Sequence, residues 1–385
     1  MSTIKAKAFQ HPSATSNNIT FNADGTHTVN AQHPTTSKNL LINGGMNVWQ
    51  RATSKASISN TSTDGYVTAD RWETYNNSLG TWTQSQSTDV PSAQGFGYSL
   101  KMDCTTADAS PGADDELAIV QKIEGQNLQH LLYSTSSAKS LTFSFWVKSN
   151  KTGNYIAEFV RDFGLPTRSV SKTYTINSAN TWEKKTISIS GDTAGSAINN
   201  NTSRGLQVQF FLAVGSNFQT GTNNESWGAY TQGNRAVGQV NLADSTSNEW
   251  YLTGCQVEIG EQATGFEFEP YETVLKKCQR YYFENREGGI FGTASNSSNV
   301  IFRQPFPVTM RIAPALSLGG GTVRIGDMVS VAFSATNSPA VTANYNGPHV
   351  GGARISGFGG LTSYRTYLLE PSGSLDGYVK FSAEL

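Results

Sequence analysis

The sequence predicts an all-β protein whose largest part is a β-sandwich. Only 15% of its 385 residues are charged, while glycine and small polar residues are plentiful, a balance typical of sandwiches with long polar loops. Short runs in which apolar and polar side chains alternate recur between residues 98 and 259, as expected of strands with one buried face. Near residue 271 this pattern changes to a helical one, so we expect one domain to end there and another to follow.

Residues 1–38 are polar and contain one brief strand-like run, at 18–29. Such a segment cannot bury a core of its own. We expect an arm that becomes ordered by docking on another protein, with a plain flexible terminus as the alternative. The arm lacks the apolar run of a signal peptide, so the chain is expected to fold in a reducing cytoplasm.

The first domain is expected to span residues 39–271. Its opening run, NLLINGGMNVWQR, predicts a strand followed by a tight turn. Asp70 and Arg71 stand beside Trp72, and we interpret them as an ion pair that joins a strand end to a loop, with a ligand site as the alternative. A short helical turn is expected at 127–133. The strands of the sandwich are expected at 98–102, 117–123, 141–149, 154–162, 172–176, 182–190, 206–214 and 248–259.

Alternation also predicts which side chains of these strands face the core. In the run at 141–149, Phe143 and Phe145 share the apolar row, and Trp146 lies on the opposite, polar face. In the last strand, one face is expected to carry Tyr251, Thr253, Cys255, Val257 and Ile259. The other face is expected to carry Leu252, Gly254, Gln256 and Glu258.

A linking helix is predicted at 272–285, because apolar residues recur there at steps of three and four. They are Val274, Leu275, Cys278, Tyr281 and Tyr282. Residues 286–385 are then expected to form a second, smaller β-domain. Its candidate strands lie at 300–306, 316–325, 328–333, 354–358, 364–369 and 378–381.

Charge and cysteine content exclude several classes of function. Lys and Arg number 28 against 29 Asp and Glu, and no stretch concentrates basic residues, so nucleic acid and anionic lipid are not expected partners. No run approaches the ~20 apolar residues of a membrane-spanning helix. The three cysteines, Cys104, Cys255 and Cys278, are odd in number and widely spaced, which indicates buried free thiols.

The order of motifs along the chain carries a family resemblance. The motifs are NLLINGGMNVWQR, TADRW, QKIEGQNLQHL, LTFSFWVKS, TWEKKTISIS, WYLTGCQVEIG, FEFEPYETVLKKCQRYYF, PFPVTMRIAP and FSAEL. Together they resemble the fibre and other virion structural proteins of tailed bacteriophages, over most of residues 39–385. The part at 89–260 also resembles the jelly-roll carbohydrate-binding modules of polysaccharide-degrading enzymes. The resemblance implies a virion surface protein with a lectin-like jelly roll.

No catalytic motif supports an enzyme. The sequence has no nucleophile elbow, no H-E-x-x-H and no phosphate-binding loop. A glycosidase would need two acids ~5–10 Å apart across a groove. The clustered acids here, Asp114, Asp115 and Glu116 and the pair Glu267 and Glu269, are better explained as solvated loops. Asp108, Asp114 and Asp115 could supply oxygen ligands to a structural calcium ion, although they lack the spacing of a regular calcium loop. We expect no other cofactor and no catalysis.

Aromatic side chains are the best candidates for a binding site. Flat rings cover the C–H face of a sugar, while amides and arginines satisfy its hydroxyl groups. The candidates are Trp146, on a polar strand face, and Trp227 and Tyr230, on the long loop at 215–247. The alternative interpretation is that Trp146 is covered and Trp227 anchors its loop. His349, Arg354 and Tyr364 are alternative receptor contacts in the C-terminal domain.

These observations predict a non-enzymatic fibre that displays a glycan-binding sandwich on a virion surface. The arm at 1–38 would attach it to other virion proteins, and the family resemblance suggests a homotrimer. A capsid decoration or head fibre with the same fold is the first alternative. The glycan-binding module of a depolymerase is the second.

Overall fold

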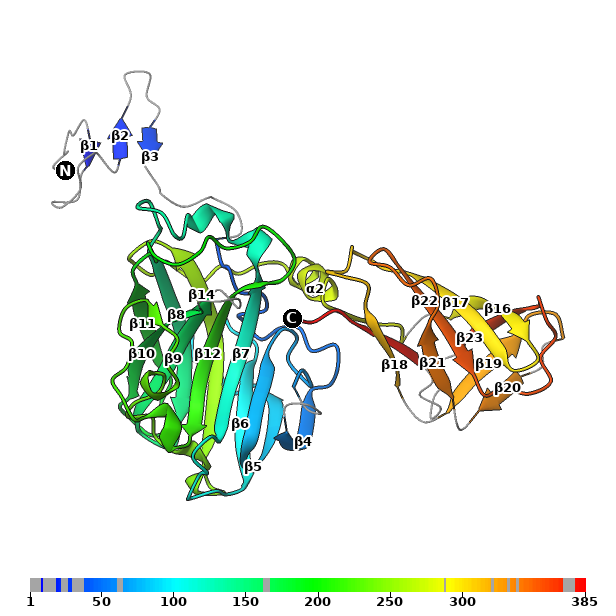
Figure 1. Cartoon of the computed structure of the whole chain (residues 1–385), viewed down its shortest axis with the longest axis horizontal. Helices are drawn as coiled ribbons and strands as arrows, with labels where there is room; N and C mark the ends of the chain where they lie inside the picture. Colours follow the sequence, from blue (N-terminus) through cyan, green and yellow to red (C-terminus); the bar gives the residue numbers. More distant parts are fainter. Residues whose placement is uncertain are drawn as a thin grey trace.

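The computed structural model describes residues 38–60, 65–161, 167–286, 289–319, 322–330, 333–336, 339–369 and 378–385, and the backbone of three short strands near the N-terminus. Those strands are β1 (Ala8–Phe9), β2 (Ile19–Phe21) and β3 (His27–Val29), which form an antiparallel sheet of their own. The rest of the predicted arm lies outside the described residues. The protein is all-β, as predicted, and the described residues form a large sandwich, one short α-helix and a smaller C-terminal β-domain (Figure 1).

The two layers of the sandwich share one long strand, β5. The first residues of β5, up to Asn77, pair with β7, and those from Thr81 onward pair with β6. Ser78 and Gly80 have positive φ angles between these halves, so the strand changes direction there and passes from one layer to the other. One layer has the order β11–β8–β14–β6–β5 and the other β5–β7–β12–β9–β10–β13, while β4 pairs with β5.

The bounds of the sandwich strands agree closely with most of the predicted runs. They are β4 (Ser54–Asn60), β5 (Glu73–Ser87), β6 (Ser99–Thr106), β7 (Glu116–Glu124), β8 (Leu141–Ser149), β9 (Gly153–Arg161), β10 (Arg168–Ile176), β11 (Glu183–Ile189), β12 (Arg204–Val214), β13 (Gly228–Ala229) and β14 (Glu249–Ile259). The predicted helical turn is confirmed as two 3₁₀ turns, η1 (Gly125–Asn127) and η2 (Gln129–Leu131).

Aromatic rings fill the space between the two layers. Phe143 and Phe145 of β8 point inward, as predicted, and their ring centroids lie 5.3 and 4.9 Å from that of Phe210 on β12. Trp250 of β14 packs on the same Phe210 ring at 5.6 Å. Truncating one such ring to alanine costs ~3–5 kcal/mol of folding free energy, so this cluster holds the layers together.

The predicted faces of β14 are wrong for its first half. Gly254 has a φ of 63°, and the pairing with β8 shifts register between Thr253 and Gln256. An extra residue inserted into a strand moves every later side chain to the other face. As a result Leu252 faces the core before the bulge and Cys255 after it, while Thr253 faces outward.

The predicted strand in the opening run is also wrong, because residues 38–53 contain no strand. Asn43 and Met46 have positive φ angles, and the Asn43 side chain organises the turn. Its amide donates to the carbonyl oxygens of Val48 and Asp70, and its oxygen accepts from two backbone amides. Side-chain hydrogen bonds of this kind offer the backbone an alternative to a sheet.

The α-helix α2 (Tyr271–Gln279) follows the sandwich. The helix was predicted to continue to residue 285, but Tyr282 to Glu284 form the strand β15, which pairs with β24 (Tyr378–Ser382). Neither α2 nor any other described helix has the length and apolar character needed to cross a membrane. All three cysteines are free and buried, as predicted.

The C-terminal β-domain has a hydrophobic core of its own, between a three-stranded and a seven-stranded sheet. The first has the order β15–β24–β18 and the second β20–β19–β23–β16–β17–β22–β21. The predicted strand at 328–333 is wrong for residues 328–330, which form a turn. The other strands are β16 (Ile290–Asn296), β17 (Asn299–Pro305), β18 (Ala315–Gly319), β19 (Val323–Asp327), β20 (Phe333–Thr336), β21 (Ala340–Ala343), β22 (Val350–Ser356) and β23 (Thr366–Leu369).

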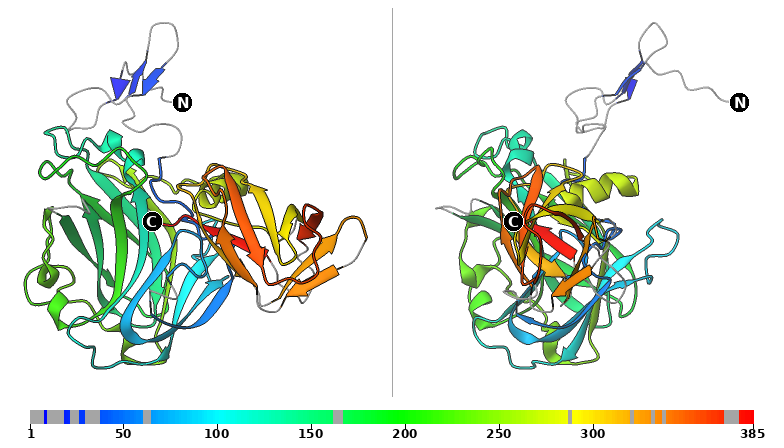
Figure 2. Two further views of the ribbon diagram at one scale, coloured as in Figure 1. Left: turned by 45° about the vertical axis from the view of Figure 1, so that its right-hand side comes forward. Right: turned by 90° about the vertical axis from the view of Figure 1, so that its right-hand side faces the viewer.

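The C-terminus of the chain lies between the sandwich and the C-terminal β-domain, as the views in Figures 1 and 2 agree. Buried charges gather at this junction. Arg51 pairs with Asp70 at 2.8 Å and with Glu384 at 2.9 Å, and Arg71 pairs with the second oxygen of Glu384. The predicted Asp70–Arg71 pair is therefore replaced by two pairs that join different segments, while Trp72 is a core residue.

Candidate functional site

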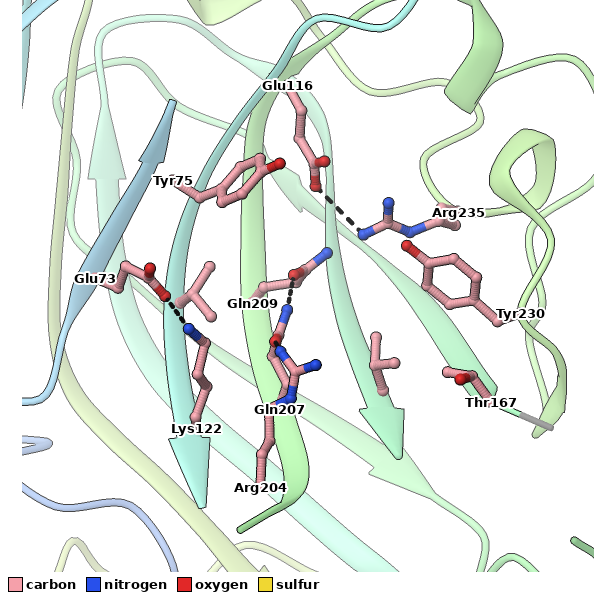
Figure 3. Close-up of a pocket in the computed structure, with 12 residues that line it drawn as sticks. Glu73, Tyr75, Glu116, Lys122, Thr167, Arg204, Gln207, Gln209, Tyr230 and Arg235 are labelled. Carbon is pink, nitrogen blue, oxygen red and sulfur yellow. Dashed lines mark hydrogen bonds and ion pairs between the residues drawn. The ribbon is translucent and has the colours of Figure 1, made fainter. Parts of the chain in front are cut away.

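The outer face of the β5–β7–β12–β9 layer contains a cleft of about 380 Å³. The long loop after β12 covers one end of this face, where Phe211 packs on Phe218 of the 3₁₀ turn η3 (Ser216–Phe218). Beyond this covered part the face is open, and the cleft lies there. Its lining comes from four strands and from the loop that carries Tyr230 and Arg235 (Figure 3).

The floor of the cleft is a set of polar side chains on neighbouring strands. Strand register places Gln207 of β12 opposite Lys122 of β7, and Gln209 opposite Val120. Arg204 donates to the Gln207 side chain at 2.7 Å, and Gln207 donates in turn to Gln209. This chain of amides continues inward, since Gln209 donates to the buried carboxylate of Glu158 at 2.7 Å.

Two tyrosines stand on opposite sides of this floor, as Figure 3 shows. Tyr75 comes from β5 and is 37% exposed, and Tyr230 comes from the loop and is 40% exposed. Burial raises the pKa of both hydroxyl groups, that of Tyr230 to about 12, so both stay protonated at neutral pH. Each ring therefore offers an apolar surface and a neutral hydroxyl group.

Arg235 holds the Tyr230 side of the cleft in place. Its guanidinium pairs with Glu158 at 2.9 Å and with Glu116 at 3.3 Å, and lies 4.7 Å from the centre of the Tyr230 ring. Burial alone would lower the pKa of Arg235, but the two carboxylates outweigh it and raise that pKa. A buried charge with two partners and a stacked ring is fixed in position, so the Tyr230 wall is preorganised.

The opposite side of the cleft is held by a second ion pair. Lys122 of β7 lies 2.7 Å from Glu73 of β5. Together with Arg235 and its two carboxylates, this pair leaves the cleft with charges that are mostly balanced internally. Such a surface suits a neutral ligand with many hydroxyl groups better than an ion.

The carboxylates that line the cleft already have partners. Glu116 and Glu73 are each paired with a cation, Arg235 and Lys122 respectively. Burial raises the pKa of Glu116, the direction that favours a proton donor, but its partner is a fixed arginine rather than an open position. Within the described residues, no three His, Cys, Asp or Glu side chains are grouped as metal ligands.

The acidic residues proposed as calcium ligands have other partners. Asp114 accepts hydrogen bonds from the side chains of Asn217 and Gln232, at 2.8 and 2.9 Å. Asp115 accepts from the backbone amide of Gly112, and Asp108 from that of Ser110. These carboxylates close loops, and they are not grouped around a common point.

The structure separates the three aromatic candidates of the sandwich. Tyr230 lines the cleft, whereas Trp146 lies half-buried on the outer face of the other layer, as its place in the strand pattern predicted. Trp227 does not line the cleft. Its indole donates to the carbonyl oxygen of Ser190 at 2.9 Å, and its ring packs edge-on against Tyr133 at 5.8 Å, so it anchors its loop.

The alternative receptor residues in the C-terminal domain are exposed but dispersed. Tyr364 is 86% exposed, at the beginning of the turn before β23. Arg354 lies on β22 and donates to Thr342, while His349 hydrogen bonds to Thr309. No cleft described in this domain brings the three together.

Sequence reasoning missed most of the cleft. Gln207 and Gln209 alternate with core residues of β12, and such an outward polar row is indistinguishable from an ordinary solvent-facing one. Glu73 and Tyr75 lie on β5, which was not predicted as a strand. The one available signal was the pair of glutamines two residues apart on β12, whose side chains can each donate and accept hydrogen bonds.

No protein-family model matches the sequence, and no similarity to a curated protein is significant. Among solved structures, the tailspike protein 4 enzymatically active domain of bacteriophage CBA120 is similar at 12% identity and a TM-score of 0.31, over 58% of this chain and 22% of that chain. TmCBM61, in complex with β-1,4-galactotriose, is similar at 12% identity and a TM-score of 0.27, over 59% of this chain and 100% of that one. The family 11 carbohydrate-binding module of Clostridium thermocellum, in complex with a β-1,3-1,4-mixed-linked tetrasaccharide, gives 9% identity, a TM-score of 0.25 and coverage of 49% and 88%. The chain thus spans about a fifth of the tailspike chain.

Proposed function

We propose that this protein binds a neutral glycan chain in the cleft on the β5–β7–β12–β9 face. The observation that supports this most directly is the placement of Tyr75 and Tyr230 on opposite sides of a floor of amide and guanidinium groups. Rings of this kind cover the apolar faces of sugar residues, and the floor can donate to and accept from their hydroxyl groups. Because the cleft is open along a strand face, it can admit the middle of a glycan chain and not only the end of one.

A glycan array tests this proposal. It would carry bacterial surface polysaccharides, β-1,4-galactotriose and a β-1,3-1,4-mixed-linked tetrasaccharide. Tyr75→Ala and Tyr230→Ala should each weaken binding of the best neutral ligand roughly tenfold, because a ring stacked on a sugar contributes ~0.5–1.5 kcal/mol beyond its area burial.

Tyr98→Ala is the matched control. Tyr98 is as exposed as Tyr75, at 37%, but lies beside the other layer. Equal binding by all four proteins would contradict the proposed site, and binding of charged glycans alone would contradict the proposed ligand class.

We further propose that the protein acts as a non-enzymatic fibre on a virion surface and presents the cleft to a host-cell glycan. The order of motifs along residues 39–385 supports this role. A homotrimer would link three weak sites, and linked copies can raise overall avidity by ~10²–10⁴. Sedimentation at micromolar concentration checks the trimer, and a monomer there would contradict it. Deletion of residues 1–38 should leave glycan binding intact and abolish attachment to the particle.

Two alternatives predict different results. Virions can be imaged with an antibody against this chain. Label on the tail would support a tail fibre, and label on the head would support a capsid decoration or head fibre. A depolymerase module would belong to a protein that releases oligosaccharides. Incubation of the full chain with the polysaccharide that binds best, followed by assay of new reducing ends, distinguishes this alternative, and steady release of oligosaccharide would overturn the non-enzymatic role.

A further inference from the structure

The last residues of the chain reach the wall of the cleft from the C-terminal β-domain. They follow β24, the central strand of the three-stranded sheet. The amide of Ala383 donates to the carbonyl oxygen of Tyr281 at 2.7 Å, and Arg311 donates to the carbonyl oxygens of Ala383 and Glu384, each at 2.6 Å. The contacts with Tyr281 and Arg311 therefore fix the direction in which residues 383–385 leave the C-terminal β-domain.

Glu384 then enters a buried cluster of sandwich residues. One oxygen of its carboxylate pairs with Arg51 at 2.9 Å, and the other pairs with Arg71. The Arg71 side chain is 1% exposed, and it also donates to the backbone carbonyl oxygen of Lys122 at 2.7 Å. A carboxylate shared by two buried guanidinium groups cannot move without separating buried opposite charges, which strongly destabilises a fold.

Leu385 makes a second contact with Lys122, this time with its side chain. Its carbonyl oxygen accepts hydrogen bonds from the side chain of Lys122 at 2.9 Å and from the hydroxyl group of Tyr66 at 3.3 Å. The Lys122 ammonium group also pairs with Glu73 at 2.7 Å, and both Lys122 and Glu73 line the cleft. The C-terminal segment thus holds Lys122 through both its backbone and its side chain.

We infer that Glu384 and Leu385 position the Lys122–Glu73 wall of the cleft, so that docking of the C-terminal β-domain on the sandwich and ligand binding in the cleft are coupled. The ligand part of this inference rests on the proposed glycan binding, whereas the positioning part does not. Coupling of this kind is reciprocal: a ligand that needs the ordered wall also stabilises the docked domain.

Hydrogen exchange on the full chain without ligand tests the positioning part. In Glu384→Ala, amides of the cleft wall at 73–77 and 116–122 should exchange roughly tenfold faster than in the wild type, in addition to the junction amides at 281–284. Arg311→Ala, which releases the segment from its own domain and also removes a hydrogen bond to the carbonyl oxygen of Thr202, should give the same pattern even if Glu384→Ala fails to fold. Faster exchange at the junction alone would overturn the inference.

Arg280→Gln is the matched control. It breaks the pair between Arg280 and Glu124 at 2.7 Å, which joins the same domains through β7 without touching Glu384 or Leu385. This variant should speed hydrogen exchange at the junction amides and leave exchange at the cleft wall unchanged. If it loosened the wall as much as Glu384→Ala, the effect would be a general loosening and the inference would be wrong.

Affinity for the neutral oligosaccharide that binds the wild type best provides the second measurement. Glu384→Ala and Arg311→Ala should bind it at least ~5-fold more weakly, and Arg280→Gln as well as the wild type. Unchanged affinity in the first two variants would overturn the coupling. If no oligosaccharide on the array bound the wild type, the proposed function would fail, and exchange at the cleft wall would still decide the positioning role.

Discussion

Neighbouring aromatic residues of the sandwich differ in role, because some pack against the core and others line the cleft. Trp227 and Tyr230 lie three residues apart in one loop, yet Trp227 packs against the core and Tyr230 lines the cleft. What separates them is the partner of each ring, Tyr133 for Trp227 and Arg235 for Tyr230. Sequence alone places both on a long polar loop and cannot supply those partners, because Tyr133 lies far away in the chain and Arg235, although in the same loop, is held in place by Glu116 and Glu158 of distant strands.

Trp227→Ala should therefore destabilise the fold. It removes the hydrogen bond to Ser190 and the edge-on contact with Tyr133, and leaves a void beside the core. We expect a loss of about 2 kcal/mol or more in unfolding free energy, less than for a fully buried tryptophan. Thermal unfolding measures this, with Tyr230→Ala as the comparison. A Trp227→Ala protein that melts like the wild type would contradict the anchoring role.

Glu183 gives a residue-scale prediction of pH dependence. Partial burial alone would raise its pKa, but Lys185 and the amide groups of Asn177 and Ser178 outweigh it and lower the pKa to about 2, from an ordinary value of 4.5. An acid whose pKa is lower in the folded state adds stability above the unfolded value, and this is lost as the pH falls from about 4.5 towards 2.

Glu183→Gln should therefore melt about 2–4 °C lower than the wild type at pH 7. The difference should shrink as the pH falls below about 4.5, since the wild-type carboxylate is then losing its charge. Calorimetry at pH 7 and at pH 3 checks both statements. An equal difference at the two pH values would show that the charge of Glu183 is not the source of this stability.

Among the elements, strands with one clean apolar row could be predicted and strands with mixed faces could not. The bounds of β8 match the predicted run, because Phe143 and Phe145 alternate with polar residues. β5 is the longest of the described strands and was not predicted, because its sequence is largely polar and it changes layers at Ser78 and Gly80. A strand that belongs to two layers has no single face that alternation can reveal.

The bulge in β14 shows the same limit. Alternation across Gly254 predicts that one row of side chains continues on the same face, but the extra residue moves the later side chains to the other face. Nothing in the composition of the strand distinguishes a glycine in a bulge from a glycine in a regular position. The cleft floor was missed for a related reason. Its glutamines become a site only when β5 and the loop of Tyr230 are placed beside them.

Gly254→Ala tests the bulge. Gly254 has a φ of 63°, and a Cβ atom there would lie 2.6 Å from Phe96 and 3.1 Å from Trp146. The variant must strain the backbone and displace rings, so we expect a loss of about 1–3 kcal/mol. Gly97→Ala is the matched control, because an added Cβ there meets nothing within 4 Å. Equal melting temperatures for the two variants would contradict the bulge.

The whole molecule joins a rigid sandwich to a second β-domain through a junction in which charges are buried and paired. The ion pairs of Arg51 and Arg71 with Glu384 join distant parts of the chain, so no local pattern in the sequence predicts these contacts. Sequence reasoning could predict two β-domains and a helix between them. The contact of the chain end with the cleft became visible only in the structure, since it depends on how the two domains are placed.

The balance of charge in the molecule gives the last prediction. The net charge is −1, and the three cations of the cleft, Lys122, Arg204 and Arg235, are matched by the carboxylates of Glu73, Glu116 and Glu158. A neutral glycan that stacks on Tyr75 and Tyr230 gains little from long-range attraction, so its affinity should change less than about threefold between ~0.05 and ~0.5 M sodium chloride. Titration calorimetry at the two salt concentrations measures this. A decrease of tenfold or more would show that ion pairing dominates, and would point to an acidic glycan held by the cations of the cleft.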